Sequence, residues 1–127
     1  MDEVVARGRG RPGAAEVQHA IGDWISVRTA RFLVPVTAEM DFGAGEWEAI
    51  SLAVEIGPHY LLMDDREPVE FARSLGLPVL TTPSLLRLAK GAGLISTVRD
   101  RLDALRANGF WLHEGPYQRI LQECGEA

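Results

Sequence analysis

Short apolar runs alternate with amphipathic stretches along most of the chain, and this pattern predicts strands and helices in turn. The clearest helix is predicted at 46–57, where Trp47, Ile50 and Ala53 share one broad apolar face and Gly57 ends it. Further helices are expected at 2–7, 13–22, 67–75, 83–91, 96–107 and 115–123. Strands are expected at 24–28, 60–63 and 78–80, with weaker strand signals at 31–36 and 110–112.

The alternation of apolar strands with helices favours a parallel sheet that is covered on both faces. We therefore expect an α/β fold, namely a three-layer α/β/α sandwich with a short parallel sheet. The sequence contains no internal repeat, low-complexity segment or long linker, so residues 1–127 are expected to form a single domain.

Composition and charge narrow the class of protein. Hydrophobic residues make up 46% of the 127 residues, which is typical of a globular chain with a real core. No apolar run is long enough to cross a membrane or to form a secretory signal, so we expect no membrane partner and a cytoplasmic location. The net charge of −5 argues against a general electrostatic attraction to nucleic acid, although local basic patches can still bind phosphate.

Two adjacent aspartates, Asp64 and Asp65, end the apolar strand predicted at 60–63. One interpretation is a solvated turn in which either aspartate caps the helix that begins near Pro68. The other is a strand end that presents carboxylates to a metal ion, because ligands of open parallel sheets bind beyond the carboxyl ends of the strands.

Glu46 is expected to lie near Asp64. The helix predicted at 46–57 precedes the strand at 60–63 and must run antiparallel to it, so the helix begins near the end of that strand. Glu46 projects toward the apolar face of this helix, whereas Glu48 falls on the polar side. The helix dipole also favours a first-turn glutamate that binds no ligand, so both interpretations stay open at this point.

Acidic side chains without histidine or cysteine suit hard ions such as Mg²⁺ or Mn²⁺. His19, His59 and His113 are scattered and show no zinc-site spacing. No G-x-S-x-G motif supports a serine hydrolase. The sequence therefore favours a divalent-metal site built from carboxylates.

The run "GEWEAISLAVEIGPHYLLMDD" resembles the acidic helix and strand of PIN domains, with Glu46, Ala53, Gly57 and Asp64 in matching places. The downstream run "ARSLGLPVLTTPSLLRLAKGAGLISTVRDRLDALRANGFWL" resembles the C-terminal part of a bacterial and archaeal branch of PIN-like proteins. The resemblance extends from Glu3 to about Tyr117 and rests on the order and spacing of the motifs.

PIN domains are metal-dependent nucleases, and many are the RNase toxins of VapC-like toxin–antitoxin pairs. The resemblance implies a Mg²⁺- or Mn²⁺-dependent ribonuclease, with RNA as the substrate and a small antitoxin protein as the partner. The alternative is a non-catalytic or degenerate PIN-like protein that acts by binding.

By the family pattern, Glu3 in "DEVV" matches an early-helix glutamate and joins Glu46 and Asp64 as the implied catalytic set. The implied metal ligands are Glu3, Glu46, Asp64 and Asp65, with Glu48 as an auxiliary candidate. Leu62 departs from the customary Thr or Asn, and the chain begins too late to contain the family's first strand and its aspartate. We therefore expect an N-terminally truncated fold with weak or no nuclease activity, whose open strand edges favour a homodimer.

Arg7, Arg9 and Arg11 lie in and beside the stretch "GRGRPG" and make the N-terminal third locally basic. These arginines are the candidate RNA-binding residues. The alternative is an ordinary solvated loop. The three tryptophans are spaced like core residues, which favours packing over base stacking.

Overall fold

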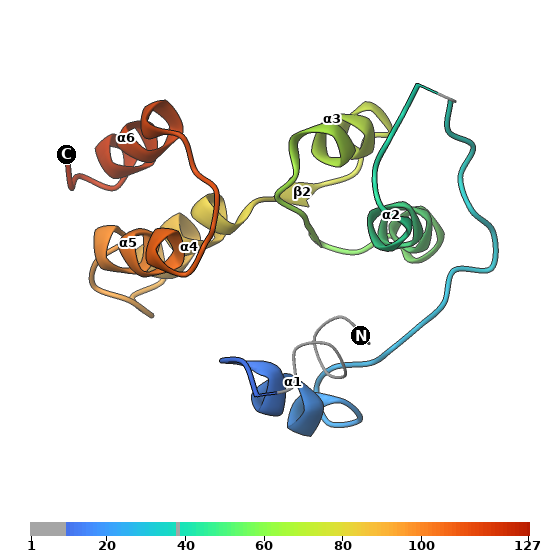
Figure 1. The fold of residues 1–127 in the computed structure, drawn as a ribbon, viewed down its shortest axis with the longest axis horizontal. Coiled ribbons are helices and arrows are strands. Elements are labelled where there is room, and N and C mark those ends of the chain that lie inside the picture. Colours follow the sequence, from blue (N-terminus) through green and yellow to red (C-terminus); the bar gives the residue numbers. More distant parts are fainter. Residues whose placement is uncertain (1–9, 38) are drawn as a thin grey trace.

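Residues 10–37 and 39–127 are described by the computed structural model, which shows six helices and two strands there (Figure 1). In chain order they are α1 (Ala14–Ala20), α2 (Ala44–Ile56), β1 (Leu61–Leu62), α3 (Arg66–Ser74), β2 (Val79–Leu80), α4 (Thr82–Gly91), α5 (Arg99–Ala107) and α6 (Glu114–Glu123). The helices predicted from residue 13 onward are confirmed with shifted ends, while the helix expected at 2–7 lies outside the described residues. Within the described residues, no helix is both long and apolar enough to span a membrane.

The two strands form a parallel pair in which Leu61 lies opposite Val79. The N–H of Leu61 donates to the carbonyl of Pro78 at 2.9 Å, and the N–H of Met63 donates to the carbonyl of Leu80 at 3.2 Å. Helix α3 supplies the crossover that parallel neighbours require. Helices combined with a short parallel sheet make this an α/β fold, as the sequence predicts.

The prediction of a strand at 24–28 is wrong. An isolated bridge joins Ile21 to Ile25 across a turn at 22–24, and the chain beyond this turn is irregular. Trp24, expected in that strand, is 78% exposed. A strand needs a neighbour for its backbone hydrogen bonds, so an apolar run that meets no partner does not become one.

The segment 31–36, a weaker strand signal, is also irregular but is fixed against α2 through Val34. The Val34 N–H donates to Ser51 Oγ at 2.9 Å, and the Val34 carbonyl accepts the indole N–H of Trp47 at 2.7 Å. Ser51 is buried, and its hydroxyl donates to the Trp47 carbonyl at 2.8 Å. These bonds satisfy the backbone of Val34 in place of a strand partner.

Buried hydrophobic side chains form two separate clusters in the described part of the chain. The first lies between α2, α3 and the sheet, and its buried members are Ile50, Ala53, Leu61, Met63, Val69 and Ala72. The second lies among the C-terminal helices, and its buried members are Val98, Leu102, Tyr117 and Leu121. Figure 1 shows these two groups of helices on opposite sides of the connection from β2 to α4.

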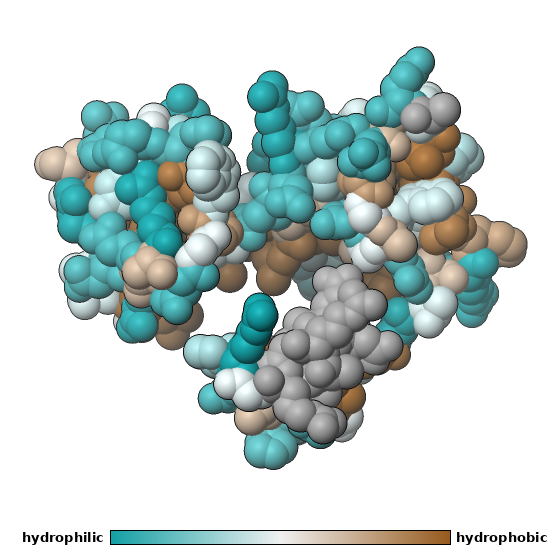
Figure 2. Space-filling model, in the orientation of Figure 1, coloured by the Kyte–Doolittle hydropathy of each residue, from teal (hydrophilic) through white to brown (hydrophobic). Residues whose placement is uncertain are grey.

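Several large hydrophobic side chains stay at the surface around α2. Phe32 is 83% exposed, Leu33 is 50% exposed, and Val54 on α2 is 51% exposed. Together they line a cavity of about 320 Å³. Figure 2 shows hydrophobic surface on the side of the molecule that holds α2.

Glu126 connects the C-terminal tail to α4 and α5. Its carboxylate accepts the Val98 N–H at 2.8 Å and the Arg99 N–H at 3.1 Å, which are the first backbone donors of α5. The Lys90 ammonium on α4 pairs with the same carboxylate at 2.9 Å. The Val98 N–H bond and the Lys90 bond lower the pKa of Glu126 from 4.5 to about 2.

Stability is expected to fall with pH because of Glu126. Since its pKa is lower in the folded chain, its contribution is fully present above pH 4.5 and is lost as pH falls toward about 2. Glu126→Gln removes this charge, so the difference in unfolding free energy between wild type and variant should shrink over that range. Urea unfolding followed by circular dichroism at neutral pH and at about pH 3 measures it. A difference that stays constant with pH would contradict the assignment.

Candidate functional site

Asp64 lies just beyond the end of β1, where it connects the ends of both strands. Its Oδ1 accepts the backbone N–H of Thr82 at 2.7 Å, and its Oδ2 accepts the Thr82 hydroxyl at 2.6 Å. Thr82 is the first residue of α4, which follows β2. Asp64 therefore holds the first turn of α4, and its negative charge lies at the positive end of that helix.

The capping hypothesis from the sequence assigned an aspartate to the helix near Pro68, and for Asp64 this is wrong. Asp65 occupies the N-cap position of α3 but makes no side-chain capping hydrogen bond there. Asp64 instead bonds across the sheet edge to a helix that begins 18 residues later. An ionised carboxylate has about four lone-pair sites, so the two bonds to Thr82 leave Asp64 able to accept further hydrogen bonds or bind an ion.

Glu46 is the third residue of α2 and is half-buried. Its carboxylate lies so close to Gly43, the N-cap residue, that a Cβ atom at that glycine would collide with it. A glutamate at this position commonly reaches back toward the N-cap backbone. The absence of a side chain at Gly43 therefore leaves room for the Glu46 carboxylate at the start of the helix.

Glu46, Asp64 and Asp65 line one cavity of about 630 Å³. The other residues that line it are Gly45, Ala49, Leu62 and Met63. The start of α2 and the end of β1 meet here, which is the convergence that the antiparallel helix and strand predict. Asp64 and Asp65 are exposed, so water and an ion can reach them. Glu48 is half-buried but does not line this cavity.

The donor set of this cavity fits a hard cation. Every charged group that lines it is a carboxylate, and no nitrogen or sulfur ligand accompanies them. Mg²⁺ keeps several waters and commonly takes only one or two protein carboxylates. Within residues 10–37 and 39–127, however, no three acidic, histidine or cysteine side chains are grouped closely enough to hold one ion. Glu3, the remaining implied ligand, lies outside the described residues.

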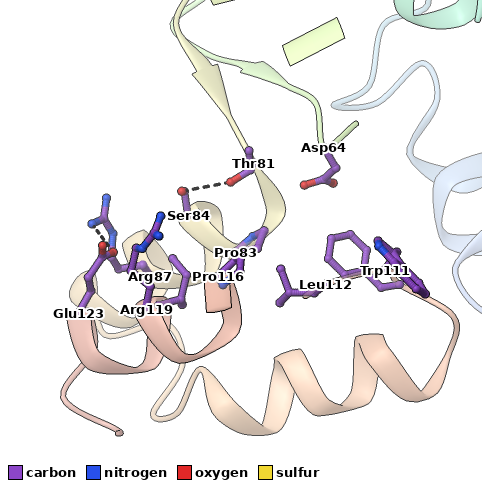
Figure 3. Close-up of a pocket in the computed structure, with 12 residues that line it drawn as sticks. Asp64, Thr81, Pro83, Ser84, Arg87, Trp111, Leu112, Pro116, Arg119 and Glu123 are labelled. Atoms are coloured by element: carbon purple, nitrogen blue, oxygen red, sulfur yellow. Dashed lines mark hydrogen bonds and ion pairs between the residues drawn. The ribbon is translucent and has the colours of Figure 1, made fainter. Parts of the chain in front are cut away.

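Asp64 also lines a second pocket, of about 400 Å³ (Figure 3). Its walls are the start of α4, one face of α6 and the segment at 110–112. Arg87, Trp111 and Arg119 line it. Sequence reasoning missed these three as site residues, because they carry no motif and come together only through the packing of α4 and α6.

Of the three candidate RNA-binding arginines, the structure describes Arg11. Arg7 and Arg9 lie outside the described residues. Arg11 is exposed and lines a cavity of about 710 Å³ together with Arg101 and Thr82. Thr82 also holds Asp64, so the wall of this cavity includes one residue that contacts the acidic site.

A family model described as a PIN domain matches residues 1–126. Comparisons with curated proteins and with solved structures found no match. The family match covers both the acidic helix and strand and the C-terminal helices.

Proposed function

Because the chain belongs to the PIN-domain family, we propose that it is a metal-dependent ribonuclease that hydrolyses the phosphodiester bonds of RNA. Membership gives the chain a nuclease-type fold in general terms. The observation that carries the proposal further is the cavity shared by Glu46, Asp64 and Asp65, next to the ends of two parallel strands. Ligand sites of parallel sheets lie in this position.

The carboxylates of Glu46, Asp64 and Asp65 are the groups that would hold Mg²⁺ or Mn²⁺, with Glu3 as the further ligand implied by the family pattern. When bound, such an ion supplies a Lewis acid that stabilises negative charge on the phosphate. Thr82 acts as a positioning residue, since its N–H and hydroxyl fix both oxygens of Asp64. Arg11, which lines the same cavity as Thr82, is a proposed contact for the RNA backbone.

We also propose that the protein is a toxin whose partner is a small antitoxin protein. The support is the hydrophobic surface formed by Phe32, Leu33 and Val54, which surrounds a cavity of about 320 Å³. Exposed apolar groups that gather in one place are typical of protein–protein contact sites. A second copy of this chain is the competing occupant of that surface.

The nuclease proposal is tested with a labelled structured RNA that contains single-stranded loops, and with an excess of the full chain, so that slow turnover is detectable. We expect cleavage with Mn²⁺ and none after the ion is removed with EDTA. Glu46→Gln should lower the rate at least about a hundredfold, because a metal ligand loses its charge and loss of a residue that only supports a ligand already costs about 10- to 100-fold. Glu55→Gln is the matched control, since Glu55 lies on the same helix and pairs with Arg31 at 3.9 Å. Cleavage that persists in EDTA, or is unchanged in Glu46→Gln, would contradict the proposal.

The second candidate function is a non-catalytic PIN-like protein that acts by binding. It is favoured by the absence, within the described ranges, of three candidate ligands grouped around one point. RNA binding without any Mn²⁺-dependent cleavage, at protein in large excess over RNA, would support this function over the first.

A further inference from the structure

The pocket between α4 and α6 has a composition that the acidic site does not explain. It combines aromatic and apolar side chains from the segment 110–112 with two arginines, Arg87 on α4 and Arg119 on α6, and one carboxylate, that of Glu123 on α6. In Figure 3, Asp64 lies across from Trp111 and Leu112, whereas Arg87 and Arg119 lie at the other end. The pocket therefore has an aromatic end beside Asp64 and a basic end away from it.

Trp111 is exposed and yet held in place. The residue is 80% exposed, so the core packing predicted for it from the sequence is wrong. Such exposure is unusual for the largest hydrophobic residue. The indole N–H donates to His113 Nε2 at 3.2 Å, and the two rings meet edge to face with centroids 5.4 Å apart. An edge contact on one side leaves an indole face open, and a fixed aromatic face is what a nucleobase stacks on.

The basic end offers one guanidinium that is not engaged elsewhere. Arg87 forms an ion pair with Glu123 at 3.0 Å. Arg119 forms no hydrogen bond or ion pair with any described residue, and it is exposed. A phosphate at this end would therefore meet Arg119 without first displacing a carboxylate.

We propose that this pocket binds a nucleotide of single-stranded RNA beside the bond to be cleaved, with its base on Trp111 and a neighbouring phosphate at Arg119. Only an unpaired base presents its face to a side chain, so the pocket selects single strands over duplexes. The inference rests on the proposed function for the role of Asp64, but the binding itself needs neither a metal ion nor cleavage.

The test is fluorescence anisotropy of a labelled, unstructured RNA oligonucleotide with the full chain in EDTA. Trp111→Ala should weaken binding at least about fivefold, which corresponds to about 1 kcal/mol of lost stacking. Trp111→Phe should retain most of the affinity. Trp24→Ala is the matched control, because Trp24 is 78% exposed and lines none of the cavities around Asp64.

The contribution of Arg119 is read from salt dependence. Arg119→Gln should weaken binding and lower the slope of log affinity against log salt by about one, as expected for one lost phosphate contact. Arg73→Gln, which changes an exposed arginine on α3, should leave the slope unchanged. A purely structural role for Arg119 would not change the slope.

The outcomes separate this inference from the proposed function. If Trp111→Ala and Arg119→Gln bind as wild type while Glu46→Gln loses cleavage, the nucleotide pocket is wrong and the nuclease stands. If both pocket variants lose binding but the wild type never cleaves RNA, the pocket stands and the nuclease is wrong. Equal affinity for a duplex of the same sequence would also overturn the pocket.

Discussion

Asp64→Asn is expected to lower the rate of metal-dependent RNA cleavage by about a hundredfold or more without unfolding the protein. Loss of a residue that only supports a metal ligand costs about 10- to 100-fold, so loss of a ligand's charge should cost at least the upper value. Asparagine can keep both bonds to Thr82, because its amide oxygen can accept the Thr82 N–H and its amide N–H₂ can donate to the hydroxyl. The substitution therefore removes the charge while preserving the contact with α4.

The measurement compares single-turnover cleavage and thermal unfolding for three variants of the full chain. Asp64→Ala should lose cleavage and also about 1 kcal/mol of stability, because the first turn of α4 loses its acceptor. Asp64→Asn should lose cleavage alone, and Glu55→Gln should lose neither. If Asp64→Asn cleaved RNA at the wild-type rate, Asp64 would be only a helix cap and its assignment as a metal ligand would be wrong.

The elements that could be predicted from sequence are those with local signals. Helix α2 has an apolar face and ends at Gly57, whose φ of 60° is one that glycine adopts without strain. The strand at 61–62 is a short apolar run that ends in two aspartates. The run at 24–28 has a similar local signal, but residues 10–37 and 39–127 supply no neighbouring strand for it. Strand formation depends on distant residues, whereas helix formation depends mainly on near ones.

In the candidate site, too, some features could be predicted from the sequence and others could not. The shared cavity of Glu46 and Asp64 could be anticipated, because an antiparallel helix and strand joined by a short turn bring these positions together. The hydrogen bond from Thr82 to Asp64 could not be predicted. One helix begins shortly after each of the two strands, and the sequence pattern does not indicate which helix the aspartate caps. The presence of Asp64, Trp111 and Arg119 in one pocket depends on how α6 packs against α4, for which the sequence has no local signal.

Because the buried side chains form two separate clusters, a single substitution in the C-terminal cluster is expected to cause a large loss of stability. Leu102 is fully buried among Val98, Tyr117 and Leu121, none of which belongs to the cluster around Ile50. Removing most of a buried leucine side chain loses its transfer free energy and leaves a cavity, which together cost about 2–5 kcal/mol. Since small domains are stable by only about 5–15 kcal/mol, Leu102→Ala should weaken the packing of the C-terminal helices severely.

The matched control is Leu94→Ala, which makes the same chemical change at a side chain that is 78% exposed and should alter stability by less than about 0.5 kcal/mol. Urea unfolding followed by circular dichroism should give a clearly lower midpoint for Leu102→Ala than for Leu94→Ala. Because α6 and the segment before it supply Arg119 and Trp111, Leu102→Ala should also weaken binding of the RNA oligonucleotide in EDTA. Equal midpoints for the two variants would mean that the C-terminal cluster does not act as a core, and the pocket between α4 and α6 would then lack the rigid walls on which nucleotide binding depends.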